Sequence, residues 1–380
     1  MARRSSADLP LHSGSAPRWL FDRMEELGGA IAAAVVDEHG PAELVARLAD
    51  PYWFQALGCA LGFDWHSSGL TTTTMGALKE AIDPEELGVA IVGGKGGTSR
   101  QTPDEIHDLP LGLGGGTRDD LERTSRLSAA VDNGCVQDGF TLYHHTMAVT
   151  EDGEWCVVQQ GMDESHARRY HWLADGVDSF VAEPQNAICS QSAAAAPLDL
   201  TAARSAENRS ASVDLVNDDP AHLRRELSGQ HSLADFGGGQ SESSGIGEQM
   251  STGPADYTLP DHHQLSRADL SERALERLDR AYEYGPEDYE ELVALDGIGP
   301  ASLRALALVA ELVYDAETAR EDPASHAYAH GGKDGTPHPV DRERYDRSIE
   351  YLQSMLEGSE TERETKQAAL QRLADARGQA

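Results

Sequence analysis

Lysine is almost absent from this sequence. Among 380 residues there are four lysines, Lys79, Lys95, Lys333 and Lys366, and arginine supplies the other basic side chains. A chain with so few lysines cannot present the broad lysine-rich surface with which many proteins attract polyanions. An anionic partner must therefore be bound by short-range contacts at defined positions.

Cysteine and long apolar runs are scarce as well. The four cysteines stand singly, without the paired spacing of a zinc site, and we expect them to be buried small hydrophobic residues. No stretch reaches the roughly 18 apolar residues of a membrane span. Two arginines follow Met1-Ala2, but no apolar run comes after them, as a secretory or twin-arginine signal would require. We therefore expect a cytoplasmic protein without zinc and without a membrane partner.

Acidic residues, in contrast, are abundant. The chain has 65 Asp and Glu against 31 Lys and Arg, which gives a formal net charge of -34 at pH 7. This excess is larger than solubility requires and, with little lysine and many small residues, is typical of haloarchaeal-type proteins adapted to molar salt. At about 1 M salt the screening length is roughly 3 Å, so the net charge does not exclude DNA as a partner.

Helix and strand patterns predict an α+β fold with two domains and a linker. In residues 1–227, apolar residues at helical spacing come first and β-prone runs follow at 88–93 and 139–162, which predicts a mainly helical N-terminal domain with a β-hairpin or small sheet. Residues 228–264 are rich in Ser, Gly and Gln and are interpreted as a low-complexity linker or long loop. Residues 265–380 show helical patterns throughout and predict an all-α C-terminal domain.

The strand region contains a turn signal. Asp152-Gly153 lies between two β-prone runs, which is typical of a two-residue hairpin turn. Counting back from that turn places His145 opposite Gln160, so that polar side chains meet at the end of the hairpin far from the turn. A short helix that carries further polar side chains is expected after the second strand.

We predict a polar site at that end of the hairpin. Carboxylate, imidazole and guanidinium groups that converge there are what metal-assisted phosphodiester cleavage requires. Asp138 and His145 are the candidate ligands of Mg²⁺ or Mn²⁺, with Arg168 or Arg169 on the phosphate. The candidate catalytic residues are Asp132, Asp138, His145, Gln160, Glu164, Arg168, Arg169 and His171. A structural polar network explains the same residues equally well.

Residues 292–312 match a helix-hairpin-helix pattern. Gly297-Ile298-Gly299 lies between two predicted helices, and Pro300 suits the first position of the second helix. The glycines let the backbone approach a phosphate, and the free N–H groups of the second helix favour an anion. Such contacts hold the DNA backbone without reading its sequence. The candidate DNA-binding residues here are Gly297, Ile298, Gly299, Ser302 and Arg304. A plain glycine-capped helix turn is the alternative.

Two of the four lysines lie in glycine-rich loops, at 93–100 and 330–335. Their retention in a lysine-poor chain favours contacts between a compact ammonium and phosphate, so Lys95, Arg100 and Lys333 are further candidates for DNA binding. Neither loop has the P-loop frame, and no nucleotide cofactor is expected. Flexible turns with solvated lysines are the alternative. Asp64 and His66, which precede a predicted helix, could line a cleft.

Several short motifs together resemble one known family. They are spread along nearly the whole chain and include Phe63-Asp-Trp-His-Ser-Ser-Gly, Gly93-Gly-Lys-Gly, Leu142-Tyr-His-His, Arg168-Arg-Tyr-His-Trp and Ala329-His-Gly-Gly-Lys-Asp-Gly. In these motifs the chain resembles the archaeal and bacterial domain of unknown function 763 family. The resemblance implies a role in DNA handling and carries no settled catalytic assignment. The chain departs from the family pattern at Ala130, where lysine is expected, and at Gln185, where histidine is expected.

These features predict a DNA-binding protein of DNA repair or processing, with a metal-dependent nuclease as its candidate enzymatic form. One alternative is a non-enzymatic DNA-binding or scaffold protein. Another is a DNA glycosylase, a group that resembles this chain in its hairpin and uses a catalytic Asp shortly downstream. Asp315 has about the required spacing, but no Val-Asp-Thr-His-like run follows it.

Overall fold

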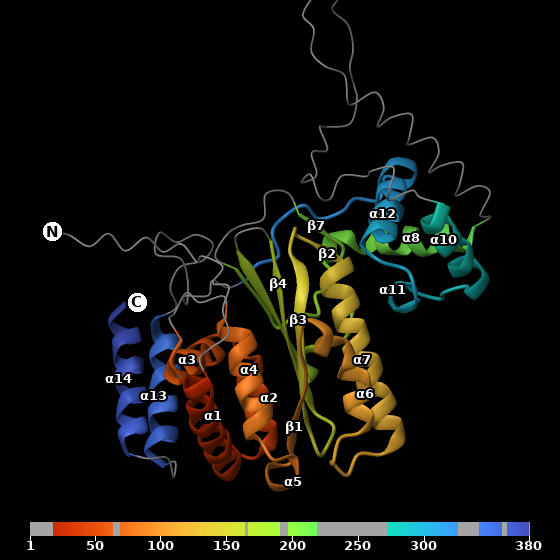
Figure 1. The fold of residues 1–380 in the computed structure, drawn as a ribbon. Helices are drawn as coiled ribbons and strands as arrows, with labels where there is room; N and C mark the ends of the chain where they lie inside the picture. The colour runs from red at the N-terminus through yellow and green to blue at the C-terminus, as the bar shows by residue number, and fades with distance from the viewer. Residues whose placement is uncertain are drawn as a thin grey trace, which may run out of the picture.

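The structure, a computed structural model, has an antiparallel sheet at its centre and helices on both faces of that sheet (Figure 1). It describes residues 18–63, 69–163, 166–190, 197–218, 272–325, 342–358 and 363–379. The helices are α1 (Arg18–His39), α2 (Pro41–Ala49), α3 (Pro51–Leu61), α4 (Leu70–Ala81), α5 (Pro84–Leu87), η1 (Gly96–Gln101), α6 (Thr102–His107), α7 (Gly115–Gly134), η2 (Ala174–Gly176), η3 (Ala203–Ser205), α8 (Ala206–Asn217), α10 (Glu272–Tyr284), α11 (Tyr289–Ala294), α12 (Pro300–Tyr314), α13 (Arg342–Gly358) and α14 (Arg363–Gln379). The strands are β1 (Val89–Lys95), β2 (Val136–Gln137), β3 (Thr141–Thr150), β4 (Trp155–Met162), β5 (Ala167–Leu173), β6 (Ala187–Ser190) and β7 (Leu198–Asp199).

Five strands form the central sheet, in the order β1-β3-β4-β5-β6, and each neighbouring pair is antiparallel. The middle strands are buried on both faces. Successive side chains on a strand point in opposite directions, so one strand contributes to the hydrophobic clusters on both sides of the sheet. On β3, Met147 and Val149 pack into one hydrophobic cluster, whereas Ala148 packs into the other. A short ladder of β2 and β7 forms a second sheet.

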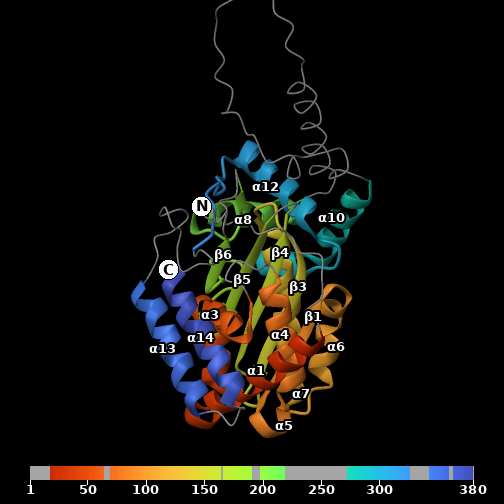
Figure 2. The same cartoon turned by 60° about the vertical axis from the view of Figure 1, so that its left-hand side comes forward.

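Two layers of helices cover the sheet. On one face α1 to α4 pack together with α13 and α14, and on the other face lie α6 and α7 (Figures 1 and 2). Helices α8, α10, α11 and α12 gather at one end of the molecule and share their hydrophobic cluster with α7. All four cysteines are buried, and none of them forms a disulfide bond. Within the described ranges, no helix is both long enough and apolar enough to cross a membrane.

The mixed helix-and-sheet architecture confirms the predicted α+β class. The helices after residue 272 are divided between the two clusters: α10 to α12 pack with α7 and α8, whereas α13 and α14 pack with α3. Among the described residues they therefore form no hydrophobic core of their own, in contrast to the expected all-α C-terminal domain. The expected domain boundaries near 228 and 264 lie outside the described residues.

The turn between β3 and β4 differs from the prediction. Thr150 N donates to Glu154 O over 2.9 Å, so the loop has three residues, and the last of them, Gly153, has a φ of 86°. A three-residue loop that ends in a left-handed glycine is a common form of hairpin. The extra residue shifts the register by one, and His145 lies opposite Gln159. The predicted pairing of His145 with Gln160 was wrong, and Gln160 belongs to the opposite face of the sheet.

The segment after β4 is also a strand and not the expected short helix. Residues 167–173 form β5, which pairs with β4 along its whole length. Tyr170 and Trp172 are β-prone, and both faces of this strand are buried, so the alternation expected of a half-exposed strand is absent. Consequently Arg168 lies on one face of the sheet, and Arg169 and His171 lie on the other. Glu164 is outside the described residues.

Candidate functional site

A cleft of about 830 Å³ lies between the sheet, helix α7 and the turn that joins α11 to α12. Its lining includes Arg100 of η1, Ser125 of α7, His145 of β3, Gln159 of β4 and Gly297 with Ile298 of the turn. The glycine hairpin and the strand histidine were singled out separately in the sequence. The fold brings them to one cleft.

A glycine places η1 beside the strand that carries the histidine. Gly93 of β1 has a φ of 87°, and a Cβ there would collide with the carbonyl oxygen of His145 and with Thr102. Glu105 fixes the backbone at Gly93, because its Oε2 accepts from Gly93 N at 2.7 Å and from Lys79 Nζ at 2.7 Å. Gly93 therefore allows the η1 loop, with Arg100, to start close to the cleft.

Helix α7 supplies a polar stripe to the sheet. Ser125, Ser128 and Asp132 recur at spacings of three and four residues, so they lie on one face of the helix. All three are buried, and β3 and β4 lie against them. Polar side chains on a buried helix face require partners, since an unpaired buried polar group is costly.

A continuous chain of hydrogen bonds provides those partners. The Oγ of Ser125 lies 2.8 Å from Nε2 of His145, and Nδ1 of the same ring lies 3.0 Å from Oε1 of Gln159. The Nε2 of Gln159 then reaches Oδ2 of Asp132 at 2.6 Å and the carbonyl oxygen of Ser128 at 3.3 Å. All these side chains are buried, although Ser125, His145 and Gln159 also line the cleft.

This series of hydrogen bonds determines which nitrogen of the His145 ring carries the proton. The carbonyl oxygen of Ser128 can only accept, and Asp132 Oδ2 already accepts from Trp172 Nε1, so the Gln159 atom beside them is the amide nitrogen and Oε1 is the carbonyl oxygen. His145 must then donate its Nδ1–H to Oε1, which leaves a lone pair on Nε2 to accept from the Ser125 hydroxyl. Burial lowers the pKa of His145, and the contact with Gln159 opposes that shift. The ring is therefore neutral near pH 7.

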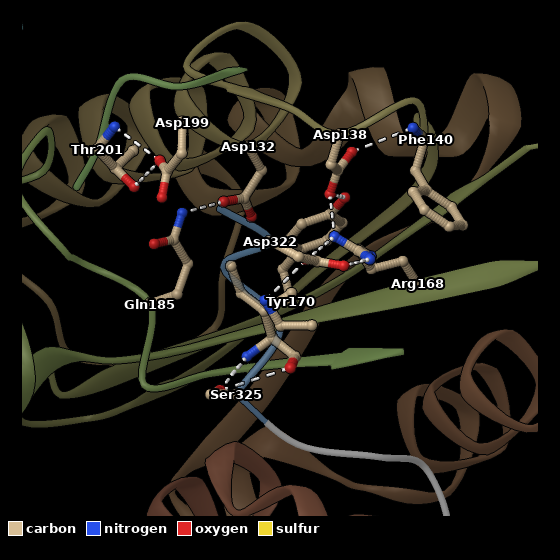
Figure 3. A network of polar contacts seen from close by, with 12 residues as sticks. Asp132, Asp138, Phe140, Arg168, Tyr170, Gln185, Asp199, Thr201, Asp322 and Ser325 are labelled. Carbon is tan, nitrogen blue, oxygen red and sulfur yellow. Dashed lines mark hydrogen bonds and ion pairs between the residues drawn. The ribbon is translucent and has the colours of Figure 1, made fainter. Parts of the chain in front are cut away.

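Asp132 anchors the far end of the chain. It also accepts from Trp172 Nε1 at 2.8 Å and from Gln185 Nε2 at 2.7 Å, and the latter contact is drawn in Figure 3. Burial raises the pKa of Asp132 to about 8, while the donors Gln185 and Trp172 oppose the shift. Gln185, where the family resemblance led us to expect histidine, thus acts as a donor to this carboxyl group.

A second buried network surrounds Asp138 (Figure 3). Its Oδ2 accepts from Arg168 Nη1 at 2.9 Å and from the Tyr170 hydroxyl at 2.8 Å, and its Oδ1 accepts from Phe140 N at 3.1 Å. The other side of the Arg168 guanidinium forms a fork on the carboxylate of Asp322, at 2.8 and 2.9 Å. Burial raises the pKa of Asp138, and the positive charge of Arg168 lowers it. The arrangement is a buried ion-pair network that ties β5 to the segment after α12.

The predicted metal ligands have separate partners. Asp138 is engaged by Arg168 and Tyr170, and both ring nitrogens of His145 are engaged within the chain that starts at Ser125. A guanidinium beside Asp138 also repels a cation. In the part of the chain that the structure describes, no three His, Cys, Asp or Glu side chains are grouped as a metal ion would require. These residues do not fit a shared Mg²⁺ or Mn²⁺ site.

The remaining catalytic candidates lie away from the cleft. Arg169 Nε donates to His171 Nε2 at 2.7 Å, and Arg169 Nη2 donates to Gln55 of α3 at 3.1 Å. Gln160 donates through Nε2 to the Tyr143 hydroxyl. The contacts of Arg169 tie the sheet to the layer of α3 and α4. They correspond to the alternative prediction, a structural polar network.

The DNA-binding candidates fall into two groups. Lys95 and Arg100 are exposed, Gly297 has a φ of 93°, and Ile298 packs against the hydrophobic cluster. Ser302 and Arg304, in contrast, are buried, and Arg304 donates to Gln137 Oε1 at 2.7 Å, so these two side chains face the protein interior. Lys333, Asp64, His66 and Glu164 lie outside the described residues. Asp315 is exposed at the C-terminal end of α12, a whole helix away from the glycine turn.

Sequence reasoning missed Ser125 and Gln159. Their signal was present: Ser125, Ser128 and Asp132 form one polar face in an otherwise apolar helix stripe. A three-residue hairpin loop would also have placed Gln159, and not Gln160, beside His145. The turn length therefore decided which polar residues met.

The comparisons with known proteins give one match. The sequence model of the family described as "Protein of unknown function (DUF763)" matches residues 5–340. This range includes every residue of the cleft and of both polar networks. No curated protein and no solved structure matches the chain.

Proposed function

The chain belongs to the DUF763 family of proteins of unknown function, and we propose that it binds DNA in the cleft between η1 and the α11–α12 turn, as a protein of DNA repair or processing. The observation that carries the proposal is the position of Gly297 and Arg100 in the lining of one cleft. A backbone turn that offers N–H groups and an exposed guanidinium are both suited to phosphate.

We propose that α11, the turn and α12 act as a helix-hairpin-helix. Gly297 adopts a φ of 93°, and a Cβ there would meet the Arg277 side chain at 3.3 Å, so the turn favours glycine. Gly299 precedes Pro300 at the start of the 15-residue α12 and provides no side-chain cap. The first N–H groups of α12 therefore have no side-chain acceptor at the cap and favour an anion there.

Exposed cations at or near the cleft add to the phosphate contact. Arg100 lines the cleft and is exposed, and the Nζ of the exposed Lys95 lies 5.7 Å from the centre of the ring of Tyr143, which also lines the cleft. Arg123 and Arg126 also line the cleft, but they form ion pairs with Glu290 and Glu122. A phosphate backbone would then lie between exposed cations and backbone donors. Contacts of this kind bind DNA without sequence preference.

The charge of the protein sets the conditions for binding. Asp119, Glu122 and Asp296 also line the cleft, and the whole chain carries a net charge of -34. Molar salt screens that repulsion over roughly 3 Å, and we propose a haloarchaeal-type protein that works in a salt-rich cytoplasm. Because only a few cations contact phosphate, affinity should fall with salt by a log–log slope of about -2, well below that of a lysine-rich protein.

The test is a titration of the purified chain with fluorescently labelled single-stranded, duplex and flapped DNA in high salt. We expect binding that differs little between unrelated sequences and that weakens when Arg100 is replaced by Ala. Absence of binding to every DNA form, from low to molar salt, contradicts the proposal. We do not extend the proposal to a metal-dependent nuclease, because Asp138 and His145 belong to separate networks.

A further inference from the structure

The hydrogen-bonded series of Ser125, His145 and Gln159 in the cleft lining has the arrangement of a nucleophile, a base and an orienting group. We propose that Ser125 is a nucleophile, activated by His145, that attacks the phosphorus of a phosphodiester bound in the cleft. The substrate class rests on the proposed DNA binding. The nucleophile does not, because the geometry of Ser125, His145 and Gln159 alone carries it.

The distances meet the requirement for such a pair. The Ser125 Oγ lies 2.8 Å from His145 Nε2, and Nδ1 of the same ring is held at 3.0 Å by Gln159. A serine becomes nucleophilic when a neighbouring base accepts its proton as the new bond forms, and the base must be held in the correct tautomer by a third group. All three residues line the cleft, so a substrate in it could reach the hydroxyl.

Several buried groups orient the His145 ring. Asp132 and the carbonyl oxygen of Ser128 fix the Gln159 amide, and Trp172 and Gln185 fix Asp132. The result is a neutral imidazole whose Nε2 lone pair points to a hydroxyl at the cleft.

The proposed reaction balances without a metal or a redox partner. As the Ser125 Oγ–phosphorus bond forms, the hydroxyl proton passes to His145 Nε2 and the bond from phosphorus to the leaving sugar oxygen breaks. The leaving oxygen takes the proton from Nε2. Water then attacks the same phosphorus, gives a proton to Nε2 and releases the Ser125 oxygen, which recovers its proton. The sum is hydrolysis of one phosphodiester bond.

The direct test is reaction of the full-length protein with diisopropyl fluorophosphate. The Ser125 oxygen would form a bond to phosphorus, the phosphorus–fluorine bond would break, fluoride would leave, and the proton would pass to His145. Intact mass and peptide mapping should show one adduct, on Ser125, that is absent from Ser125→Ala. The rate should fall about 10²-fold or more in His145→Gln, because a general base contributes about that factor.

Two controls keep the test specific. Ser212→Ala removes the hydroxyl of another buried serine, which lies on α8 and does not line the cleft, so this variant should react like the wild type. Thermal unfolding of every variant establishes that it is folded. Absence of an adduct from the folded wild type, or an adduct of equal amount in Ser125→Ala, overturns the proposed nucleophile.

A second readout separates the nucleophile from its substrate. With labelled DNA in excess EDTA, wild type should produce cleaved strand and a covalent protein–DNA species on a denaturing gel, and Ser125→Ala should bind DNA but produce neither. Labelling of Ser125 by the fluorophosphate in a protein that binds no DNA would retain the nucleophile and remove the phosphodiester as its substrate.

Discussion

The Nε2 of Gln159 donates to the carboxyl group of Asp132 over 2.6 Å, and this contact turns the amide oxygen, not the amide nitrogen, toward His145. An amide can rotate by half a turn with little change in shape, so its orientation depends on its neighbours. Asp132 thereby acts on Ser125 at a distance, through two intermediate side chains.

Replacement of Asp132 by Asn tests this relationship. Above its pKa of about 8 the Asp132 carboxyl group presents two acceptors, whereas Asn presents one donor and one acceptor, so only the Ser128 carbonyl oxygen would still hold the Gln159 orientation. We expect labelling of Ser125 by diisopropyl fluorophosphate to slow by about tenfold or more, while DNA binding changes little. Unchanged labelling in a folded Asp132→Asn protein would show that the chain does not govern the serine.

Asp132 should also affect stability in a pH-dependent way. Burial raises its pKa to about 8 in the folded protein, whereas the unfolded chain has an ordinary Asp pKa of about 4. Between these values the folded state binds more protons, so the free energy of unfolding falls as pH rises from about 4 to 8, with a slope that approaches 1.4 kcal/mol per pH unit. Urea unfolding at several pH values should show a shallower decline for Asp132→Asn than for wild type, and equal slopes would contradict the assignment.

The pH dependence of Ser125 labelling reports on His145. Burial lowers the pKa of this histidine below that of a free imidazole, so the neutral ring that accepts the proton persists to a lower pH. The labelling rate should therefore be level around pH 7 and above, and fall only as the pH drops through the lowered pKa. A rate that halves near pH 7 would contradict a neutral buried base.

The glycine turn can be tested with a matched glycine elsewhere. Gly297→Ala places a side chain at a φ of 93° and against Arg277, so the backbone donors of the turn should shift and DNA of all sequences should bind about tenfold more weakly. Gly285→Ala is the control, because Gly285 also has a positive φ of 70° but does not line the cleft. The double replacement Gly297→Ala and Gly299→Ala should weaken binding further. Equal DNA affinity of the Gly297 and Gly285 variants would reduce the turn to a structural element.

Lys95 and Arg100 should contribute to phosphate binding individually. Replacement of either by Ala should weaken DNA binding and reduce the log–log salt slope by about one. Lys95→Arg should restore only part of the loss, because a guanidinium does not replace a compact ammonium in a glycine loop. Arg204→Ala is the matched control, since Arg204 is exposed but pairs with Glu317 away from the cleft. Equal salt slopes for the Arg100 and Arg204 variants would exclude a phosphate contact at Arg100.

The sequence predicted the class of fold and the glycine turn, because each depends on local pattern. Gly297 and Pro300 mark the turn by residue type, and hydrophobic periodicity marks the helices. The sequence could not place the polar residues, because it does not distinguish a two-residue from a three-residue loop after Thr150. A difference of one residue in that loop moves every β4 side chain to the other face of the sheet. Nor could the sequence show that Arg168 would meet Asp322, since that pair joins segments far apart in the chain.

The Asp138 network should behave as structure. Asp138→Ala leaves the Arg168 guanidinium buried with one of its partners removed, and loss of one member of a buried pair costs about 3–5 kcal/mol. We expect urea unfolding to show such a loss in the free energy of unfolding. Under conditions where the variant is folded, it should bind DNA with the affinity of the wild type. Glu317→Ala, which removes an exposed ion-pair partner, should change stability little. A fully stable Asp138→Ala protein would contradict a structural role.

The most direct test of DNA binding in the cleft is hydrogen–deuterium exchange of the full-length protein with and without saturating duplex DNA in high salt. We expect slower exchange at residues 96–101 of η1 and 293–299 of the α11–α12 turn, with α13 at 342–358 unchanged as the internal reference. Slower exchange elsewhere, with both cleft segments unchanged while DNA is bound, would contradict it.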